Sequence, residues 1–221
     1  LWMTLYGQDP DTGEVQEKQQ DTLSICIMGD MMMHTAQIHK GSNDGKVYNF
    51  SAYFQHLEDR IRQADIAIAN MEYTLAGGPY TGYPAFSDSY ASYFSEIGFD
   101  VFLTSNNHIY DKGARGAERT IMEFEKLGIS IAGIASDQQM YDEVFPLAIE
   151  CKGVTIAILN ATYGTNVGSG KEWPKILRLN DKEALATALG KASGCDIALV
   201  FPHWGTEYEL THSMAQEMDA K

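Results

Sequence analysis

The sequence from Val101 to Gly113, VFLTSNNHIYDKG, joins a short apolar run to a group of polar residues. Val101–Thr104 consists of Val, Phe, Leu and Thr, a composition that favours a buried strand. Asn106, Asn107 and His108 follow just after this run. Two adjacent amides and an imidazole contribute little to core packing, so they indicate a functional site. The stretch therefore predicts a buried strand whose carboxyl end opens onto a site.

Three other predicted strands also end in side chains that can bind a metal ion or transfer a proton. In an α/β fold the carboxyl ends of parallel strands border one crevice, and ligands bind there. We therefore expect these residues to lie close together although they are far apart in the sequence. They are Asp30 and His34 after Leu23–Met28, Asn70 and Glu72 after Ile66–Ala69, and His203, Trp204 and Glu207 after Ile197–Phe201.

The other apolar runs alternate with amphipathic segments, and this alternation predicts the α/β class. Residues 150–153 (ECKG) separate two apolar runs and predict a tight hairpin turn. The Gly-rich loops Gly77–Pro84 and Gly164–Pro174 are long, as loops that border a site often are. The further predicted strands are Ile129–Ala132, Leu147–Glu150 and Val154–Leu159, and the predicted helices are Ser51–Gln63, Ser87–Ile97, Arg115–Leu127 and Lys182–Ala192.

Length and composition predict one globular domain. The chain has 221 residues, of which 44% are hydrophobic and 21% charged. Its 16 Lys and Arg against 30 Asp and Glu give a formal charge of −14, which excludes non-specific nucleic-acid binding. No apolar stretch is long enough for a membrane-spanning helix. Residues 1–22, polar from Gly7 onward, predict a leader or tether, and residues 23–221 predict the domain.

The three cysteines are too few for a disulfide scaffold. Cys26 lies in an apolar run, and we expect it to be a buried thiol. Cys151 and Cys195 can in principle pair, but two unrelated core thiols are the better interpretation.

The residue types at the strand ends suit a metal site. Asp, Glu, Asn and His are ligands for Zn, Mn and Fe, and two such ions can activate a water and hold a phosphoryl-type oxygen. Each motif alone has a plainer interpretation: Gly29-Asp30 as a turn, or Asn70 and Glu72 as caps. Lys112 and Arg115 are the nearest cations for an anionic substrate, or else a solvated pair.

Four tyrosines flank the predicted crevice: Tyr73, Tyr80, Tyr83 and Tyr163. They can stack on a sugar or hold a peptide-like chain, although ordinary loop aromatics are the plainer interpretation.

Taken together, the motifs resemble the bacterial poly-γ-glutamate capsule biosynthesis family of the CapA type. The resemblance extends from Leu23 to the end of the chain, with the motifs in the family's order. That family is related to calcineurin-like metallophosphoesterases, so the resemblance implies a four-layer α/β/β/α sandwich. The motifs are Met28-Gly29-Asp30-Met31-Met32, Ala69-Asn70-Met71-Glu72, Ser105-Asn106-Asn107-His108 with Asp111 and Gly113, and His203-Trp204-Gly205 with Glu207-Tyr208.

The resemblance also implies roles for individual residues. It assigns one or two divalent ions (Mn, Zn or Fe) to Asp30, Glu72, Asn107 and His203, and the role of general acid to His108. Contacts to the substrate or to these groups would come from the neighbouring residues Asn70, Asn106, Asp111, Lys112, Arg115, Trp204, Glu207 and His34.

The sequence departs from the metallophosphoesterase pattern in three places. Met31 and Met32 follow Asp30, where that pattern has Asp-x-His. Asn70-Met71-Glu72 replaces its Gly-Asp-x-x-Asp, and no Gly-His-x-His-like loop appears before Lys221. We therefore expect a domain that is incomplete at its C-terminal end.

Two functions from different classes fit these observations. The first is a metal-dependent, phosphoesterase-type hydrolase of poly-γ-glutamate or related envelope-polymer biosynthesis, acting on an anionic polymer or a small phosphorylated substrate. The second is a non-catalytic module that binds a glycan or peptide polymer on the same fold. Either would work outside the cytoplasm at the cell envelope, with a leader or anchor removed, alongside other polymer-synthesis proteins.

Overall fold

The computed structural model describes residues 22–42, 48–75, 77 and 85–220, which contain two main β-sheets. The first sheet is parallel, with neighbouring strands in the order β1 (Ile25–Asp30), β2 (Ile66–Asn70), β5 (Val101–Leu103) and β6 (Ser130–Ala132). The second sheet has the order β11 (Ile197–His203), β9 (Val154–Thr162) and β8 (Leu147–Cys151). In it β9 is parallel to β11 and antiparallel to β8.

Helices and short strands connect and cover these sheets. The helices are α1 (Thr35–Gly41), α2 (Ser51–Phe54), α3 (Glu58–Gln63), α4 (Asp88–Ile97), α5 (Gly113–Lys126), α6 (Gln138–Val144), α7 (Lys182–Ala192) and α8 (Met214–Asp219). The short strands form two pairs, β3 (Thr74–Leu75) with β4 (Ala85–Phe86) and β7 (Ile134–Ala135) with β10 (Lys175–Ile176).

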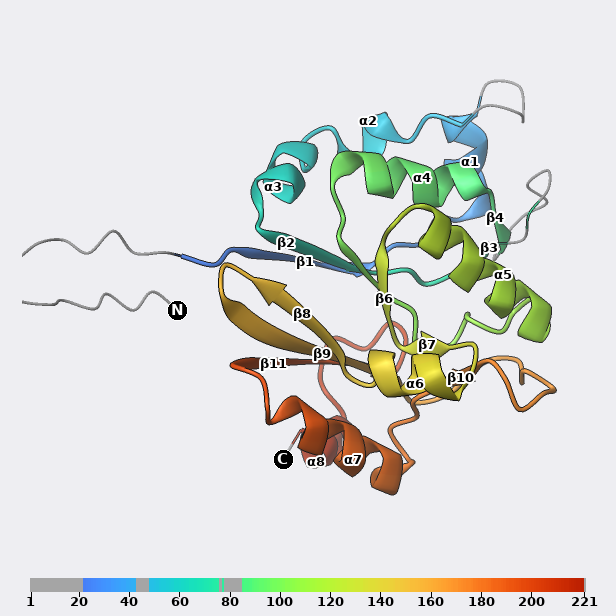
Figure 1. The fold of residues 1–221 in the computed structure, drawn as a ribbon. Helices are drawn as coiled ribbons and strands as arrows, with labels where there is room; N and C mark the ends of the chain where they lie inside the picture. The colour runs from blue at the N-terminus through green and yellow to red at the C-terminus, as the bar shows by residue number, and fades with distance from the viewer. Residues whose placement is uncertain (1–21, 43–47, 76, 78–84, 221) are drawn as a thin grey trace, which may run out of the picture.

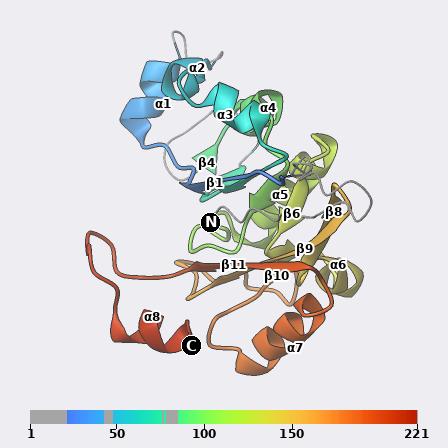
Figure 2. The same cartoon turned by 90° about the vertical axis from the view of Figure 1, so that its left-hand side faces the viewer.

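The two sheets lie face to face with helices outside them (Figures 1 and 2). One apolar cluster fills the space between the first sheet and helices α1 to α5, and a second lies between the two sheets. A third packs β9 against α6 and α7. Strands β2 and β5, and β9 from Ile156 on, are buried on both faces, as their continuous apolar runs predict, whereas β8 and β11 alternate partly buried with exposed residues.

The alternation of side chains along β9 explains how one strand serves two cores. Ile156 and Ile158 point into the cluster between the sheets, while Leu159 and Ala161 belong to the cluster beneath α6 and α7. All four side chains are buried. The α/β class predicted from the sequence is confirmed.

The carboxyl ends of the parallel strands meet at one edge of the molecule. In the first sheet Asp30, at the end of β1, pairs in register with Asn70, at the end of β2. A bulge between Met28 and Asp30 breaks the regular pairing just before this point. In the second sheet His203 ends β11.

Asn160, on β9, ties the two sheets together near that edge. Its Oδ1 accepts from the backbone N–H of Ser105 at 2.6 Å, and its Nδ2 donates to the carbonyl of Phe201 at 2.9 Å. The loop after β5 and the end of β11 are therefore held to one buried amide. Gly133 packs against this contact, because a Cβ there would lie 2.3 Å from Asn160 Oδ1.

The hairpin predicted at residues 150–153 is confirmed, because Cys151 pairs with Val154 across the turn. Lys152 and Gly153 have φ values of 52° and 74°, the left-handed conformations of a two-residue turn that twists with the strands. Lys152 also forms an ion pair with Asp65 at 2.7 Å. The contact with Lys152, together with hydrogen bonds from Ser24, lowers the pKa of Asp65 to about 2.

Other expectations are corrected. The predicted helix Ser51–Gln63 is two short helices, α2 and α3, and Leu57 between them is 38% exposed, not part of an apolar face. Helices α1, α6 and α8 and the two short strand pairs were not predicted. Cys26, expected to be buried, is only partly so, and all three cysteines are unpaired. The predicted leader, residues 1–22, lies outside the described residues except for Thr22.

Replacing Gly133 with Ala is expected to lower the free energy of unfolding by about 2–4 kcal/mol, because φ is +116° and the added methyl would strike Asn160 and Ser105. Urea unfolding measures the change. As a matched control, Gly190→Ala on α7 adds its methyl to open space and should stabilise the chain by about 0.5–1 kcal/mol. Equal stability of the two variants would contradict this account of the contact between the sheets.

Candidate metal centre

Three side chains that suit a metal ion converge at the common edge of the two sheets. One ligand atom each from Asp30, Glu72 and His203 lie within 4.8 Å of one another. His203 Nδ1 lies 3.8 Å from Asp30 Oδ1, and His203 Nε2 lies 3.7 Å from Glu72 Oε1. Because Asp30 and His203 belong to different sheets, the group forms only where the two sheets meet.

Amide side chains hold this group in place. Asn70 Nδ2 donates to Asp30 Oδ1 at 2.6 Å and lies 3.3 Å from His203 Nδ1. Asn106 in turn donates to Asn70 Oδ1 at 3.2 Å and to the carbonyl of Met71 at 3.0 Å. The two asparagines, both buried, therefore position the carboxylate and the imidazole.

Asn107 extends the group with an amide oxygen. Its Oδ1 lies 2.8 Å from His203 Nε2, and its Nδ2 donates to Asn166 Oδ1 at 3.4 Å. The backbone N–H of Asn166 also donates to the carbonyl of Asn107 at 2.9 Å. The oxygen of Asn107 thus faces the same ring that contacts Glu72.

His108 lies on the other side of Glu72 and is held by Asp111. His108 Nε2 is 3.8 Å from Glu72 Oε1, and His108 Nδ1 is 2.5 Å from Asp111 Oδ2. The second oxygen of Asp111 is buried and has no hydrogen-bond partner among the described residues. Thr74 Oγ1 donates to the carbonyl of His108 at 2.8 Å and fixes the backbone there. The imidazole is therefore oriented with Nε2 toward the carboxylates.

The electrostatics of the group favour a bound cation. Burial, helped by the neighbouring charge of Asp30, raises the pKa of Glu72 to about 7. The partly buried carboxylate of Glu72 lies near the exposed carboxylate of Asp30, and a positive ion between the two would relieve their repulsion. Burial also lowers the pKa of His203, which favours the neutral imidazole that a metal requires.

The pKa of His108 is shifted in the opposite direction to that of His203. Burial acts to lower its pKa, but the hydrogen bond and charge of Asp111, with the charges of Glu72 and Glu207, outweigh burial and raise it. The two histidines are thus tuned apart, with His203 suited to be a ligand and His108 to carry a proton.

The donor set fits a divalent ion such as Zn²⁺ or Mn²⁺. Two carboxylates, one amide oxygen and one neutral imidazole are oxygen and nitrogen donors of the kind these ions take. Asp30, Glu72 and His203 have ligand atoms close enough to share one ion. Asn107, the fourth ligand that the resemblance implies, lies next to them, with its Oδ1 2.8 Å from His203 Nε2.

Of the other predicted site residues, some lie near the metal-ligand group and others lie away from it. Trp204 follows His203 and is partly buried, and the exposed Glu207 is close enough for its charge to act on Glu72. His34 stands just before α1, exposed, and is not part of the metal-ligand group. Lys112 and Arg115 are exposed at the start of α5, and neither forms an ion pair in the described part of the chain.

Two asparagines in the site were missed by sequence reasoning. Asn166 contacts Asn107 and His108, and Asn160 ties the loop of Ser105 to β11. The only signal for Asn166 was its place in the Gly-rich loop Gly164–Pro174, which was expected to border a site. Asn160 stood within an apolar run, where a buried polar side chain indicates a structural contact. Of the four tyrosines, Tyr73 is a core residue, Tyr163 is half-exposed, and Tyr80 and Tyr83 lie outside the described residues.

Comparison with known proteins decides the family. The model of the bacterial capsule synthesis protein family (PGA_cap) matches residues 24–221. The chain belongs to this family. Its relatives include the capsule biosynthesis protein CapA of Bacillus anthracis, 25% identical over 94% of this chain and 52% of that protein. The PGA biosynthesis protein CapA of Bacillus subtilis is 26% identical over 95% of this chain and 56% of that protein.

Membership of this family confirms the resemblance seen in the motifs. The matched residues, 24–221, include all four strand ends that carry those motifs. The chain spans about half the length of the two curated relatives. Within the described residues, no helix has the length and apolar character needed to cross a membrane.

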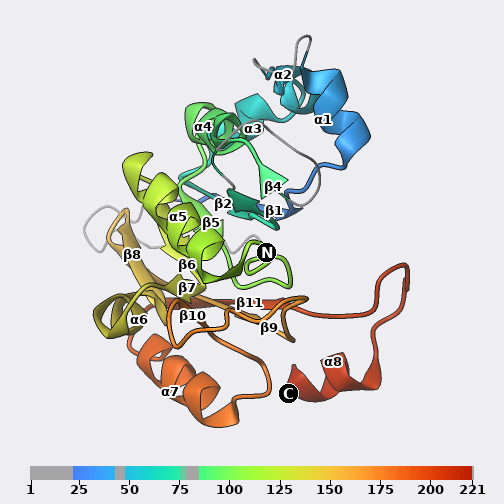
Figure 3. The same cartoon turned by 90° about the vertical axis from the view of Figure 1, so that its right-hand side faces the viewer.

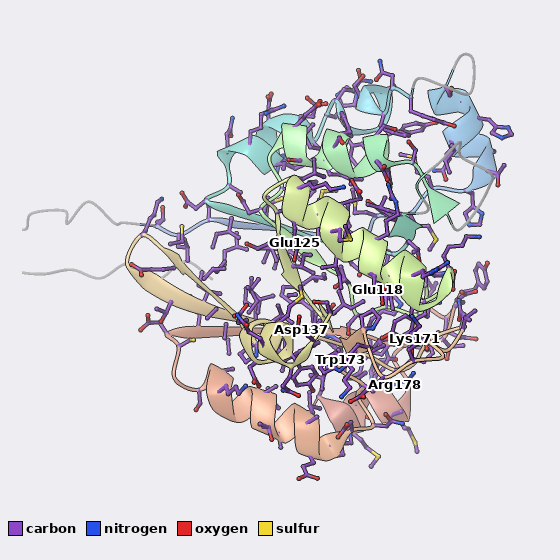
Figure 4. All side chains as sticks on the ribbon, turned by 45° about the vertical axis from the view of Figure 1, so that its right-hand side comes forward. Glu118, Glu125, Asp137, Lys171, Trp173 and Arg178 are labelled. Atoms are coloured by element: carbon purple, nitrogen blue, oxygen red, sulfur yellow. The ribbon has the colours of Figure 1, made fainter. Side chains whose placement is uncertain are left out.

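Asp30→Asn is expected to weaken binding of Mn²⁺ or Zn²⁺ by about 100-fold or more, since loss of even an outer contact to a metal ligand costs roughly 10–100-fold. Titration calorimetry with each metal salt, and mass spectrometry of the bound metal, measure this. Glu125→Gln, an exposed carboxylate on α5 (Figure 4), is the matched control and should bind as the unmodified chain does. A chain that binds neither metal, or an Asp30→Asn variant that binds as well, would rule out the centre.

Proposed function

We propose that this chain carries the metal-dependent, phosphoesterase-type site of an enzyme that makes capsule or a related cell-envelope polymer. The observation that carries the proposal is the convergence of Asp30, Glu72 and His203 with an oriented His108 beside them. Family membership supports the biological setting, and the two curated relatives are named for capsule and PGA biosynthesis. We also infer that the layered arrangement is the four-layer α/β/β/α sandwich of calcineurin-like metallophosphoesterases.

In this proposal each part of the site has one task. Asp30, Glu72, Asn107 and His203 hold one or two divalent ions. A bound ion supplies positive charge that neutralises a phosphoryl-type oxygen and lowers the pKa of a water molecule.

His108 carries the proton in this scheme. Its Nε2 faces the carboxylate cluster, from where it donates the proton to the leaving oxygen. Asp111 accepts a hydrogen bond from Nδ1 of His108 and keeps Nε2, which donates the proton, on the substrate side. The substrate is an anionic polymer or a small phosphorylated molecule, and the enzyme acts outside the cytoplasm.

A second candidate function is a non-catalytic module that binds a glycan or peptide polymer. It is favoured by Met31 and Met32, which stand where related phosphoesterases have a metal-binding His, and by the exposed ring of Tyr163 beside His203. In that case the crevice binds a polymer without cleaving it, and His108 serves as a hydrogen-bonding group. The two functions differ in turnover.

His108→Asn is expected to lower hydrolysis of p-nitrophenyl phosphate by about 100-fold or more in the presence of Mn²⁺, because general acid catalysis contributes roughly 10²–10⁴-fold. Release of p-nitrophenolate measures the rate, and metal binding of the variant should stay intact. The control is His56→Asn, an exposed histidine in the turn between α2 and α3. No hydrolysis by the unmodified chain loaded with metal would favour the binding module.

Asp111→Asn is expected to lower kcat by about 10–100-fold with little change in metal affinity, because it removes the acceptor that orients His108. Asp111→Glu, which keeps the carboxylate, should recover part of the rate, whereas a purely structural defect would not be rescued in this way. Asp142→Asn, an exposed aspartate on α6 that pairs with Lys191, is the control. An unchanged kcat in Asp111→Asn would remove this residue from the mechanism.

A further inference from the structure

A cavity of about 490 Å³ lies beside the metal centre, between the segment after β11, the start of α7 and the start of α8. Figure 3 shows this segment leaving β11, bending back and entering α8 below the second sheet. The volume of the cavity falls within the roughly 300–1,000 Å³ of pockets that hold small molecules. Its lining residues are Tyr163, Leu179, Asn180, Lys182, Trp204, Gly205, Thr206, Ser213, Ala215 and Gln216.

Two aromatic side chains join this cavity to the metal centre. The ring of Tyr163 stacks on the ring of His203, with centroids 6.1 Å apart and an interplanar angle of 16°. Trp204 also lines a second hollow of about 260 Å³ that includes Asp30, Asn70 and His203. A molecule in the larger cavity would therefore lie next to the group that holds the metal.

The aromatic rings and the polar lining together suit a sugar. Tyr163 is 52% exposed and lines the cavity, so it can stack on the apolar face of a sugar ring. Asn180 and Thr206 supply a neutral amide and a hydroxyl that can both donate to and accept from sugar hydroxyls. Gln216 and Ser213 add the Nε2–H and Oγ–H donors, since their oxygens already accept from each other's backbone N–H.

The charge of the lining argues against an acidic polymer as the occupant. Lys182 is the one charged residue among the ten that line the cavity. The chain as a whole has a formal charge of −14, so a segment with many carboxylates would be repelled unless several cations faced it. A neutral ring needs no such cations.

We propose that this cavity is a carbohydrate-binding subsite, which takes the sugar ring of a substrate whose phosphate is held at the metal centre. Binding of the ring follows from the cavity itself, whereas the phosphate at the adjacent centre rests on the proposed function. The substrate class is accordingly a sugar phosphate or the phosphate-linked sugar of a glycan.

The first test is binding of uncharged sugars to the metal-free chain. N-acetylglucosamine, glucose and galactose are titrated by calorimetry, and at least one is expected to bind saturably. Tyr163→Ala and Asn180→Ala should weaken binding by about tenfold, while Tyr163→Phe, which keeps the ring, should change it by less than about twofold. Glu125→Gln, the exposed control on α5, should bind the sugars normally, because Glu125 belongs to neither the cavity nor the metal centre.

The second test joins the cavity to the metal centre. With Mn²⁺ present, the 1-phosphate of the sugar that binds should bind at least about tenfold more tightly than the free sugar, and Asp30→Asn should abolish this gain. Sugar binding without turnover of any phosphoester would leave the subsite standing and reject the proposed catalysis.

Three results would overturn the subsite. They are no saturable binding of any sugar, equal binding by Tyr163→Ala and the unmodified chain, and tight binding of a γ-glutamyl oligomer that sugars do not displace. A sugar phosphate that binds no more tightly than its sugar would show that the cavity and the metal centre do not share one substrate.

Discussion

The buried amide of Asn160 is the contact on which the arrangement of the site depends. It joins the backbone of Ser105, which leads into Asn106, Asn107 and His108, to the carbonyl of Phe201, two residues before His203. Because one side chain satisfies both backbone groups in a buried place, the two sheets cannot slide past each other without leaving polar atoms unpaired. The edge where the first and second sheets meet is therefore fixed in register, and the candidate metal centre is built across it.

Around that edge the chain places groups of opposite electrostatic tendency. Glu72 is a carboxylate in a partly buried position beside Asp30, an arrangement that is unfavourable without a cation. His203 is shifted toward its neutral form and His108 toward its charged form, although the two rings contact the same carboxylate. Opposite shifts of two neighbouring histidines are frequent at functional sites and contribute little to a stable core.

Local sequence patterns predicted most of the strands and several of the helices. Runs of Val, Ile, Leu and Phe marked all seven strands of the two main sheets, most clearly β2 and β5, which are buried on both faces and need apolar side chains on both. Predictions from a single helical face were weaker. Ser51–Gln63 has apolar residues at helical spacing, yet the helix ends at Phe54, a second helix begins at Glu58, and Leu57 between them is exposed. The helix α8 was missed although its sequence carries a start signal, because Ser213 and Gln216 form a capping box there, while Met214 and Met218 stay exposed.

The sequence by itself determined the residue types at each strand end, the α/β class and the motifs of the capsule synthesis family, because these follow from local composition and order along one chain. Only the tertiary structure decided which of those residues share a site. It brought Asp30, Glu72 and His203 within reach of one ion and added Asn166 from a distant loop. It also placed His34 just before α1, Lys112 just before α5 and Arg115 on α5, all three exposed. Distances between segments far apart in the chain are set by how the sheets pack, and that packing is a property of the whole molecule.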